Sequence, residues 1–271
     1  MRRDPRSSQD RRWQSWLVAI VFAMAVSFWA APLSAAPVRV QYPEGPAHGY
    51  VVLSDLNGKA LAHGELTQWL ERRAIVSRLV FRFDDGSIYD EVIRFSQDRT
   101  FRLLSYHLVQ KGPSFTESSD IRFDDAGRYK ARVRSSPDEE EEEASGTIAL
   151  PNDVSNGMTS MLLRNLRHGE SATTRILAFD PKPRILELHL KPDGTNSYWV
   201  GRQQATATRY LVEPEVTGVT GVFATIIGKQ PSSRYIWLAE GKPPIMIRFE
   251  GPLYSDGPVW RVELSAPRWE H

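Results

Sequence analysis

Hydrophobic and polar residues alternate with a period of two along much of the chain. In one run, Leu79, Phe81 and Phe83 alternate with Arg78, Val80 and Arg82. Comparable runs lie at 89–95, 101–109, 129–134, 185–190, 206–212, 235–238, 245–249 and 259–264. Successive side chains of a β-strand point to opposite faces, so each run predicts a strand. Counted on this template, the chain holds roughly a dozen strands.

Short polar segments separate these runs and are typical of tight turns. Segments 84–87, 124–127 and 191–194 combine aspartate with glycine, residues that tolerate positive φ or bond their own backbone. Strand, turn and strand at this spacing predict an antiparallel meander. A sheet of this size can curl. The expected fold is therefore mainly β, a large curved antiparallel sheet, half-barrel or open barrel, with one or two helices covering the concave face.

One segment departs from the period of two. Residues 153–168 place apolar side chains at helical spacing, which predicts an amphipathic helix that starts at Asp153 and ends before Gly169. We expect its stripe to pack on the concave face and to form the lid of a ligand-binding cavity. The residues assigned to this lid are Met158, Met161, Leu162 and Leu166. Residues 66–73 fit a second helix or a strand equally well.

Two further segments have unusual composition. The acidic tract 138–143 lacks the alternating ligands and turn glycine of a calcium loop, which favours a solvated loop between strands. The glycine-rich apolar segment 218–228 is too short to cross a bilayer, and it predicts a buried strand or a lid over a cavity.

The N-terminus has the three parts of a secretory signal peptide. Five arginines precede an apolar run at 16–31, and Ser34-Ala35-Ala36 supplies small residues for cleavage. We place cleavage after Ala35, so that residues 1–35 are the signal peptide and 36–271 one β-rich periplasmic domain. An uncleaved anchor is the alternative, although the apolar run is short for a full span. The Arg11-Arg12 pair makes a twin-arginine route a minor alternative.

Composition narrows the chemistry further. The chain has no cysteine, which removes disulfides, thiolate nucleophiles, cysteine metal sites and a lipoprotein anchor. Loss of the signal peptide removes five arginines and two aspartates from the 34 basic and 33 acidic residues, and the formal net charge changes from +1 to −2. Nucleic acid is therefore not an expected partner. We expect no cofactor.

No catalytic motif is present. The sequence lacks a Gly-x-Ser-x-Gly elbow, a Ser-x-x-Lys pair, a phosphate loop and His-Glu-x-x-His, and its histidines show no helical metal spacing. Two histidines in predicted strands, His107 and His189, could meet carboxylates after folding, and they carry the alternative hypothesis of a hydrolase. A protein that is not an enzyme is the preferred interpretation.

A curved sheet with an aromatic and aliphatic inner face can enclose a lipophilic cavity. Five tryptophans and many phenylalanines and tyrosines follow residue 36. The first hypothesis is therefore a periplasmic protein that binds or carries a lipid or an acyl chain. The second is an envelope scaffold without a cavity, which would bind a protein partner.

The C-terminal part resembles a known superfamily. Tyr-Ile-Trp-Leu-Ala-Glu-Gly-Lys-Pro-Pro-Ile at 235–245, continued to Leu253, is similar to hairpins of the periplasmic lipoprotein-carrier-like (LolA-like) half-barrels and of their uncharacterised exported bacterial relatives. The resemblance covers residues 170–265. It implies a curved antiparallel sheet with helices over its concave face, where a lipophilic ligand or acyl chain binds. The lid-holding arginine of those carriers has no matching position here.

Overall fold

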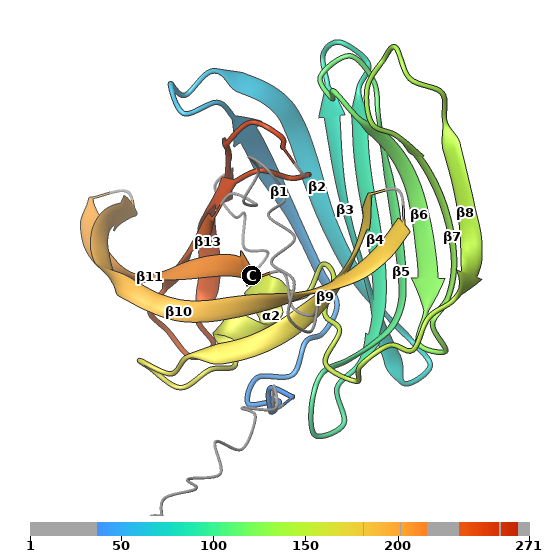
Figure 1. Cartoon of the computed structure of the whole chain (residues 1–271). Helices are drawn as coiled ribbons and strands as arrows, with labels where there is room; N and C mark the ends of the chain where they lie inside the picture. Colours follow the sequence, from blue (N-terminus) through green and yellow to red (C-terminus); the bar gives the residue numbers. More distant parts are fainter. Residues whose placement is uncertain (1–36, 181, 201, 216–232, 255, 265–271) are drawn as a thin grey trace, which may run out of the picture. The chain divides into compact units, whose positions relative to one another are not determined.

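Alternating side chains place most of the described residues in strands. The computed structural model describes residues 37–180, 182–200, 202–215, 233–254 and 256–264. The predicted signal peptide and the glycine-rich segment 218–228 lie outside these residues. Within them, fourteen strands form a single antiparallel sheet (Figure 1).

The strands are β1 (Ala47–Ser54), β2 (Ala60–Glu71), β3 (Ala74–Phe83), β4 (Ile88–Ser96), β5 (Arg102–Lys111), β6 (Ser118–Asp124), β7 (Arg128–Arg134), β8 (Glu142–Thr147), β9 (Ala172–Asp180), β10 (Lys182–Val200), β11 (Gln203–Glu215), β12 (Arg234–Ala239), β13 (Ile245–Gly251) and β14 (Trp260–Leu264). Their order in the sheet is β8-β7-β6-β5-β4-β3-β2-β1-β14-β13-β12-β11-β10-β9. Every pairing but one joins strands that follow one another in the chain. The exception is β1 with β14, where Val51 lies opposite Leu264.

The sheet curls without closing, because its edges β8 and β9 do not pair with each other. Near these two edges, strands β7 and β9 contact each other through the rings of Tyr129 and Phe179, whose centroids are 5.5 Å apart. Figure 1 shows the sheet wrapped around a central space. The predicted fold class, a large curved antiparallel sheet in an open barrel, is confirmed.

The inner face carries the apolar half of each alternating run. In β3, Phe81 and Phe83 are buried and Leu79 is half-buried, whereas Arg78 and Arg82 are exposed on the other face. In β10, Leu186, Leu188 and Leu190 are buried in the same way. Burial of such side chains, at about 25 cal/mol per Å² of apolar surface, is the main force that holds a chain without cysteine.

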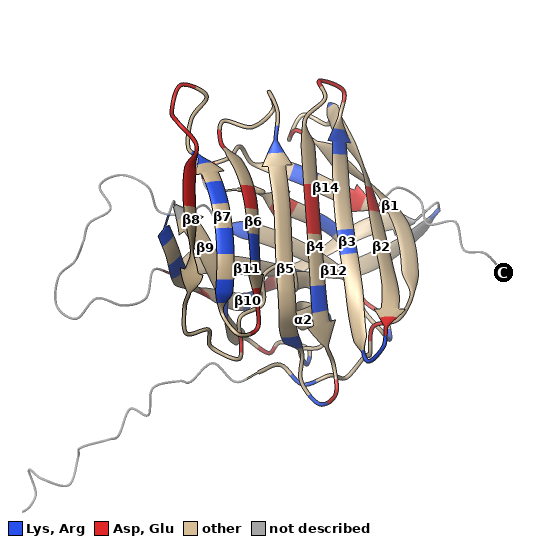
Figure 2. Ribbon diagram, turned by 90° about the vertical axis from the view of Figure 1, so that its right-hand side faces the viewer, with Lys and Arg blue, Asp and Glu red and all other residues tan. Residues whose placement is uncertain are grey.

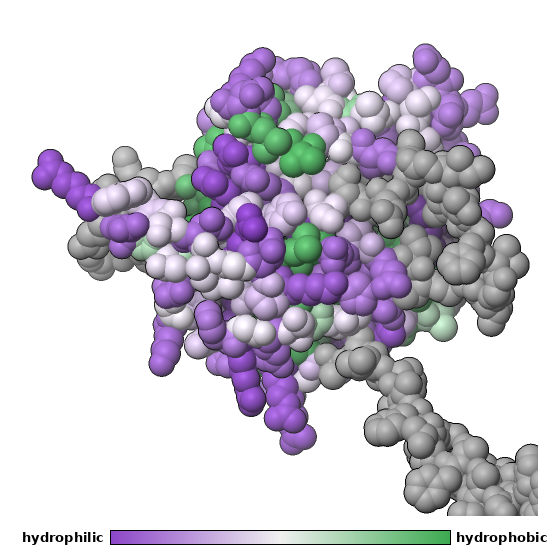
Figure 3. All heavy atoms as spheres, turned by 60° about the vertical axis from the view of Figure 1, so that its left-hand side comes forward, coloured by the Kyte–Doolittle hydropathy of each residue, from purple (hydrophilic) through white to green (hydrophobic). Residues whose placement is uncertain are grey.

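Ion pairs between strands cover much of the outer face, where charged residues of both signs lie side by side (Figure 2). Arg78 contacts Asp90 at 2.6 Å, and Asp120 accepts hydrogen bonds from Arg132 at 2.8 Å and from Arg122 at 3.1 Å. Partial burial raises the pKa of Asp120, but the hydrogen bonds from both arginines and from His107 outweigh it and lower the pKa to about 2. On the face that Figure 3 shows, apolar residues gather in separate patches within a largely hydrophilic surface.

The helix of the described chain, α2 (Thr159–Arg164), lies in the connection between the two edge strands, β8 and β9. Met161, Leu162 and Leu163 of this helix are buried in the core, and Figure 1 shows α2 at one end of the barrel. The expectation of a helix that covers the concave face is thus confirmed. Residues 66–71, for which helix and strand were both open, belong to β2, and Arg72 has a positive φ of 57° in the turn that follows.

The predicted bounds of this helix were wrong, because residues 153–156 bond to edge strand β9 instead of to each other. Ser155 donates its backbone N–H to the Arg175 carbonyl at 2.8 Å, and Arg175 donates its own N–H to the Asp153 carbonyl at 3.2 Å. The side-chain amide of Asn156 bonds both backbone groups of Leu177, at 2.9 Å each. Asp153 therefore caps no helix, and α2 begins only after Gly157, whose φ is +70°.

Candidate ligand-binding cavity

The interior of the barrel holds a cavity of about 580 Å³, within the size range of ligand-binding sites. Inner-face residues from most of the sheet line it, together with the residues before and within α2. The apolar wall includes Val51, Leu66, Leu79, Phe81, Ile93, Met161, Ile176, Leu188, Val212, Ile236, Ile245, Met246, Phe249, Leu253, Val262 and Leu264. Such a surface can enclose an apolar molecule.

The four residues predicted to form a lid lie around this cavity in different ways. Met161 lines it directly. Met158 and Leu162 are buried in the hydrophobic core, and Leu166 packs against that core half-buried. The movement of this segment as a lid stays a prediction.

Glu91 is a carboxyl group on the inner face of β4. Its Oε1 accepts hydrogen bonds from the phenol of Tyr106 at 3.0 Å and from that of Tyr89 at 3.2 Å. Burial raises the pKa of Glu91, and these two hydrogen bonds only partly oppose the shift. The side chain keeps some accessible surface because it faces the cavity. A Cβ at position 157 would lie 3.0 Å from Oε2, so Gly157 permits the close approach of the α2 segment.

Arg234 brings a cation to the inner face of β12. It shares the parity of Ile236 and lines the cavity with it. Its Nε donates to the Pro252 carbonyl at 3.2 Å, and it makes no ion pair with any carboxylate of the described residues. Burial lowers the pKa of Arg234, but a guanidinium keeps its charge at neutral pH.

Glu44 and Arg164 form an ion pair at the α2 side of the cavity. Arg164 Nη1 lies 2.9 Å from Glu44 Oε1, and Arg164 Nε donates to the Pro244 carbonyl at 2.8 Å. Burial raises the pKa of Glu44, against the opposing effects of Arg164 and of a hydrogen bond from Gln68. Asn165, next in the chain, accepts the backbone N–H groups of Gln41 and Tyr42 on its Oδ1, both at 2.7 Å. The segment 41–44 therefore holds the end of α2.

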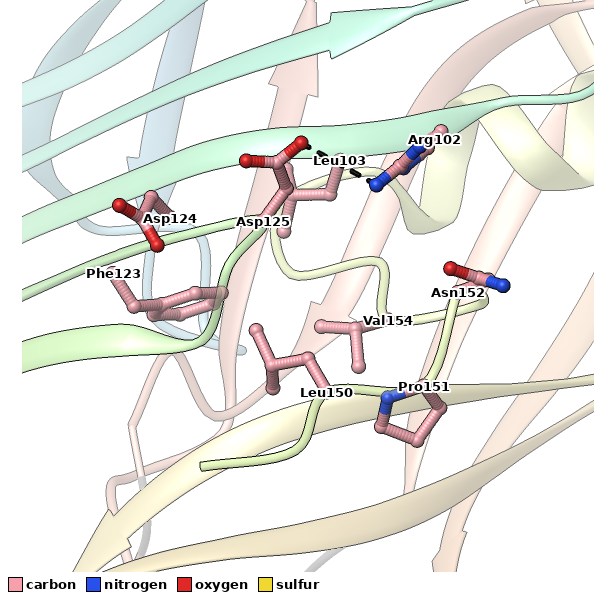
Figure 4. Close-up of a pocket in the computed structure, with 9 residues that line it drawn as sticks. All are labelled: Arg102, Leu103, Phe123, Asp124, Asp125, Leu150, Pro151, Asn152 and Val154. Carbon is pink, nitrogen blue, oxygen red and sulfur yellow. Dashed lines mark hydrogen bonds and ion pairs between the residues drawn. The ribbon is translucent and has the colours of Figure 1, made fainter. Parts of the chain in front are cut away.

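A second hollow lies between β5, β6 and the connection that leads to α2 (Figure 4). Its volume is about 20 Å³, which is room for roughly one water molecule. Both of its aspartates already have cationic partners. Asp124 accepts a hydrogen bond from Arg128, and Asp125 forms an ion pair with Arg102 at 3.4 Å. This hollow does not accommodate a substrate.

The two histidines on which the hydrolase hypothesis rests, His107 and His189, lie on the outer face of the sheet. His107 Nε2 is 3.0 Å from Asp120, within the arginine cluster of the outer face. His189 contacts Glu215 at 2.6 Å through Nε2 and the Thr173 hydroxyl at 3.2 Å through Nδ1. Neither histidine lines the cavity or the smaller hollow. A hydroxyl, an imidazole and a carboxylate do meet at His189, but away from both the cavity and the smaller hollow.

The charged lining of the cavity was missed by sequence reasoning, although strand parity could have found it. Glu91 has the parity of the buried Ile93, and Arg234 has that of Ile236 and Leu238. Charges at inner positions of otherwise apolar strands are unusual and indicate a polar site. Within the described residues, no three histidine, aspartate or glutamate side chains gather as metal ligands.

Comparisons with known proteins give one structural match. No family model matches the chain, and no curated protein does. A solved structure of a β-barrel-like protein of the domain of unknown function DUF1849, from Brucella abortus, aligns over 83% of this chain and 98% of its own, at 10% identity and a TM-score of 0.41. The likeness is one of fold and carries no functional argument. The resemblance to lipoprotein carriers is not confirmed.

In the described part of the chain, α2 falls far short of the length and apolar character that a membrane-spanning helix needs.

Proposed function

We propose that the chain is an exported, non-enzymatic protein that binds a lipophilic molecule inside its open barrel. The cavity of about 580 Å³ with its largely apolar wall carries this proposal. Each methylene that moves from water into such a wall contributes about 0.8 kcal/mol, so an acyl chain is a ligand of matching chemistry. The basic and apolar N-terminus supports export to the periplasm.

The test is to purify the protein from cells, extract it and identify bound lipid by mass spectrometry, with titration of a fluorescent fatty acid in parallel. Leu79→Trp fills the cavity from β3, and we expect it to reduce lipid occupancy. Val92→Trp is the matched control, because Val92 lies on the opposite face of β4 from Glu91 and Ile93 and does not line the cavity. A folded wild-type protein that carries no lipid and binds no fatty acid would refute the proposal.

The envelope scaffold is the other function kept from the sequence. It predicts a specific protein adduct after crosslinking in cells and no co-purified lipid. The open cavity favours the lipid-binding function, because a pure scaffold needs no space inside its sheet.

A further inference from the structure

Arg234 is a partly buried cation that pairs with no carboxylate of the described residues. Its Nε bonds the Pro252 carbonyl, and no other hydrogen-bond acceptor among the described residues contacts its guanidinium. Placing an unpaired charge inside a protein costs several kcal/mol unless a partner compensates it. The side chain lines the cavity, so a bound ligand can reach the remaining N–H donors.

The other charged groups of the cavity lining already have partners. Glu44 and Arg164 neutralise each other at 2.9 Å, and the carboxyl of Glu91 accepts hydrogen bonds from two phenols. Those phenols, Tyr89 and Tyr106, line the same cavity as Glu91 and Arg234. Among the charged residues that line the cavity, Arg234 is therefore the one without a charged or phenolic partner among the described residues.

The surrounding backbone holds the arginine stem in place. A Cβ on Gly251 would lie 2.7 Å from Arg234 Cγ and 3.0 Å from its Cβ, so only glycine at this position of β13 lets the side chain pass. The Pro252 carbonyl then fixes Nε. With Nε held, the two terminal nitrogens form a planar pair of donors, the arrangement that binds a carboxylate.

We propose that the ligand is an apolar chain that ends in a single negative charge, a carboxylate, and that Arg234 binds this group. The inference rests on the proposed function and names the chemical class of its ligand. One free guanidinium balances one negative charge. A head group with a second negative charge would leave that charge in the cavity without a cation, which disfavours it. The apolar wall of the cavity binds the apolar chain of the ligand.

The experiment compares three probes with the same chain, dodecanoate, dodecanol and dodecylamine, on the full protein stripped of lipid. Isothermal titration calorimetry gives the affinities of wild type, Arg234→Gln and Arg248→Gln. Arg248 is the matched control, since it lies on the neighbouring strand β13 opposite Trp237, pairs with Glu263 and does not line the cavity. We expect Arg234→Gln to weaken dodecanoate binding about tenfold or more while dodecanol binding changes less than about twofold, and Arg248→Gln to change neither.

A measurement on wild type alone covers the case in which Arg234→Gln does not fold. With dodecanoate labelled by ¹³C at its carboxyl, the bound head group should stay ionised at a lower pH than free dodecanoate, because the guanidinium favours the anion. Equal affinity for acid and alcohol, tightest binding of the amine, or a bound acid that protonates more readily than the free one overturns the inference and leaves lipid binding standing. Failure to bind any of the three overturns both.

Discussion

Glu91 is the side chain whose ionisation should act most directly on the stability of the barrel. Burial raises its folded pKa above the ordinary value of 4.5. The folded state therefore binds a proton more tightly than the unfolded state, and stability falls as pH rises from 4.5 through the folded pKa. Glu91→Gln keeps the size and one acceptor oxygen but cannot ionise.

We expect the free energy of unfolding of Glu91→Gln, relative to wild type, to increase with pH across this window, by at most about 1.4 kcal/mol per pH unit. Urea unfolding of both proteins at a series of pH values measures the difference. Glu44, whose pKa burial also raises, is present in both and cancels. Parallel stability curves would show that Glu91 titrates normally in the folded protein.

The ionisation of Asp120 changes the stability in the opposite direction from that of Glu91, and it does so at lower pH. Its folded pKa of about 2 lies below the ordinary 3.8, so its stabilisation is complete above 3.8 and is lost as pH falls toward 2. Asp120→Asn should cost about 2 kcal/mol at neutral pH and progressively less in acid. Asp125→Asn is the control, because its contact with Arg102 is exposed and should contribute less than about 1 kcal/mol. Equal effects of both variants in urea unfolding would contradict the pairing.

At the scale of single residues, strand parity can indicate which side chains point inward but not which of them meet. Parity places Glu91 and Tyr106 on inner faces, yet their hydrogen bond also depends on the register of β4 with β5, and this register shifts between Arg94 and Phe95. The pair of Glu44 with Arg164 joins segments 120 residues apart. Alternation within one strand carries no information on such distances.

At the scale of the elements, we predict that α2 regulates access to the cavity. Its end is held by the ion pair of Arg164 with Glu44, which is partly buried. Arg164→Gln leaves Glu44 without its cation, so we expect amides such as Leu162 and Asn165 to exchange hydrogen faster while those of β3 and β4 do not change. Dodecanoate should slow the exchange of α2 in wild type. Mass spectrometry or NMR of hydrogen exchange measures both effects.

The control for this experiment is Arg167→Gln, because Arg167 is exposed just beyond α2. Amides of α2 that exchange only with global unfolding, in every variant and with every lipid, would mean that the helix is a fixed plug. The sequence predicted a helix here but overestimated its length, and α2 buries Met161 and Leu162 of the predicted stripe together with Leu163, which the stripe did not include. Competition from edge strand β9 for the backbone of 153–156 is a tertiary effect, and helical spacing cannot reveal it.

At the scale of the whole molecule, the sequence predicted the class of the fold because every hairpin is local. Turns such as the one at Gly86, whose φ is +84°, and the alternation on each side of them predict an antiparallel meander, and in the structure twelve of the thirteen pairings join strands that are neighbours in the chain. The pairing of β1 with β14 has no such local cause. It joins the meander β1–β8 to the meander β9–β14 through residues far apart in the chain.

That one distant pairing has a consequence for the rate at which the protein folds. Closing the long loop between β1 and β14 requires most of the chain to be ordered first or a large entropy to be lost, and non-local contacts slow folding. A circular permutant that begins near Pro151, continues through β14, joins Leu264 by a linker to the segment 37–46 before β1, and ends after β8 would pair every strand with its neighbour in sequence. It would also keep the contacts of residues 41–44 with the end of α2. We expect it to refold faster than the natural order at similar stability, as measured by stopped-flow fluorescence. The natural order would then be the kinetically slower arrangement of the same sheet.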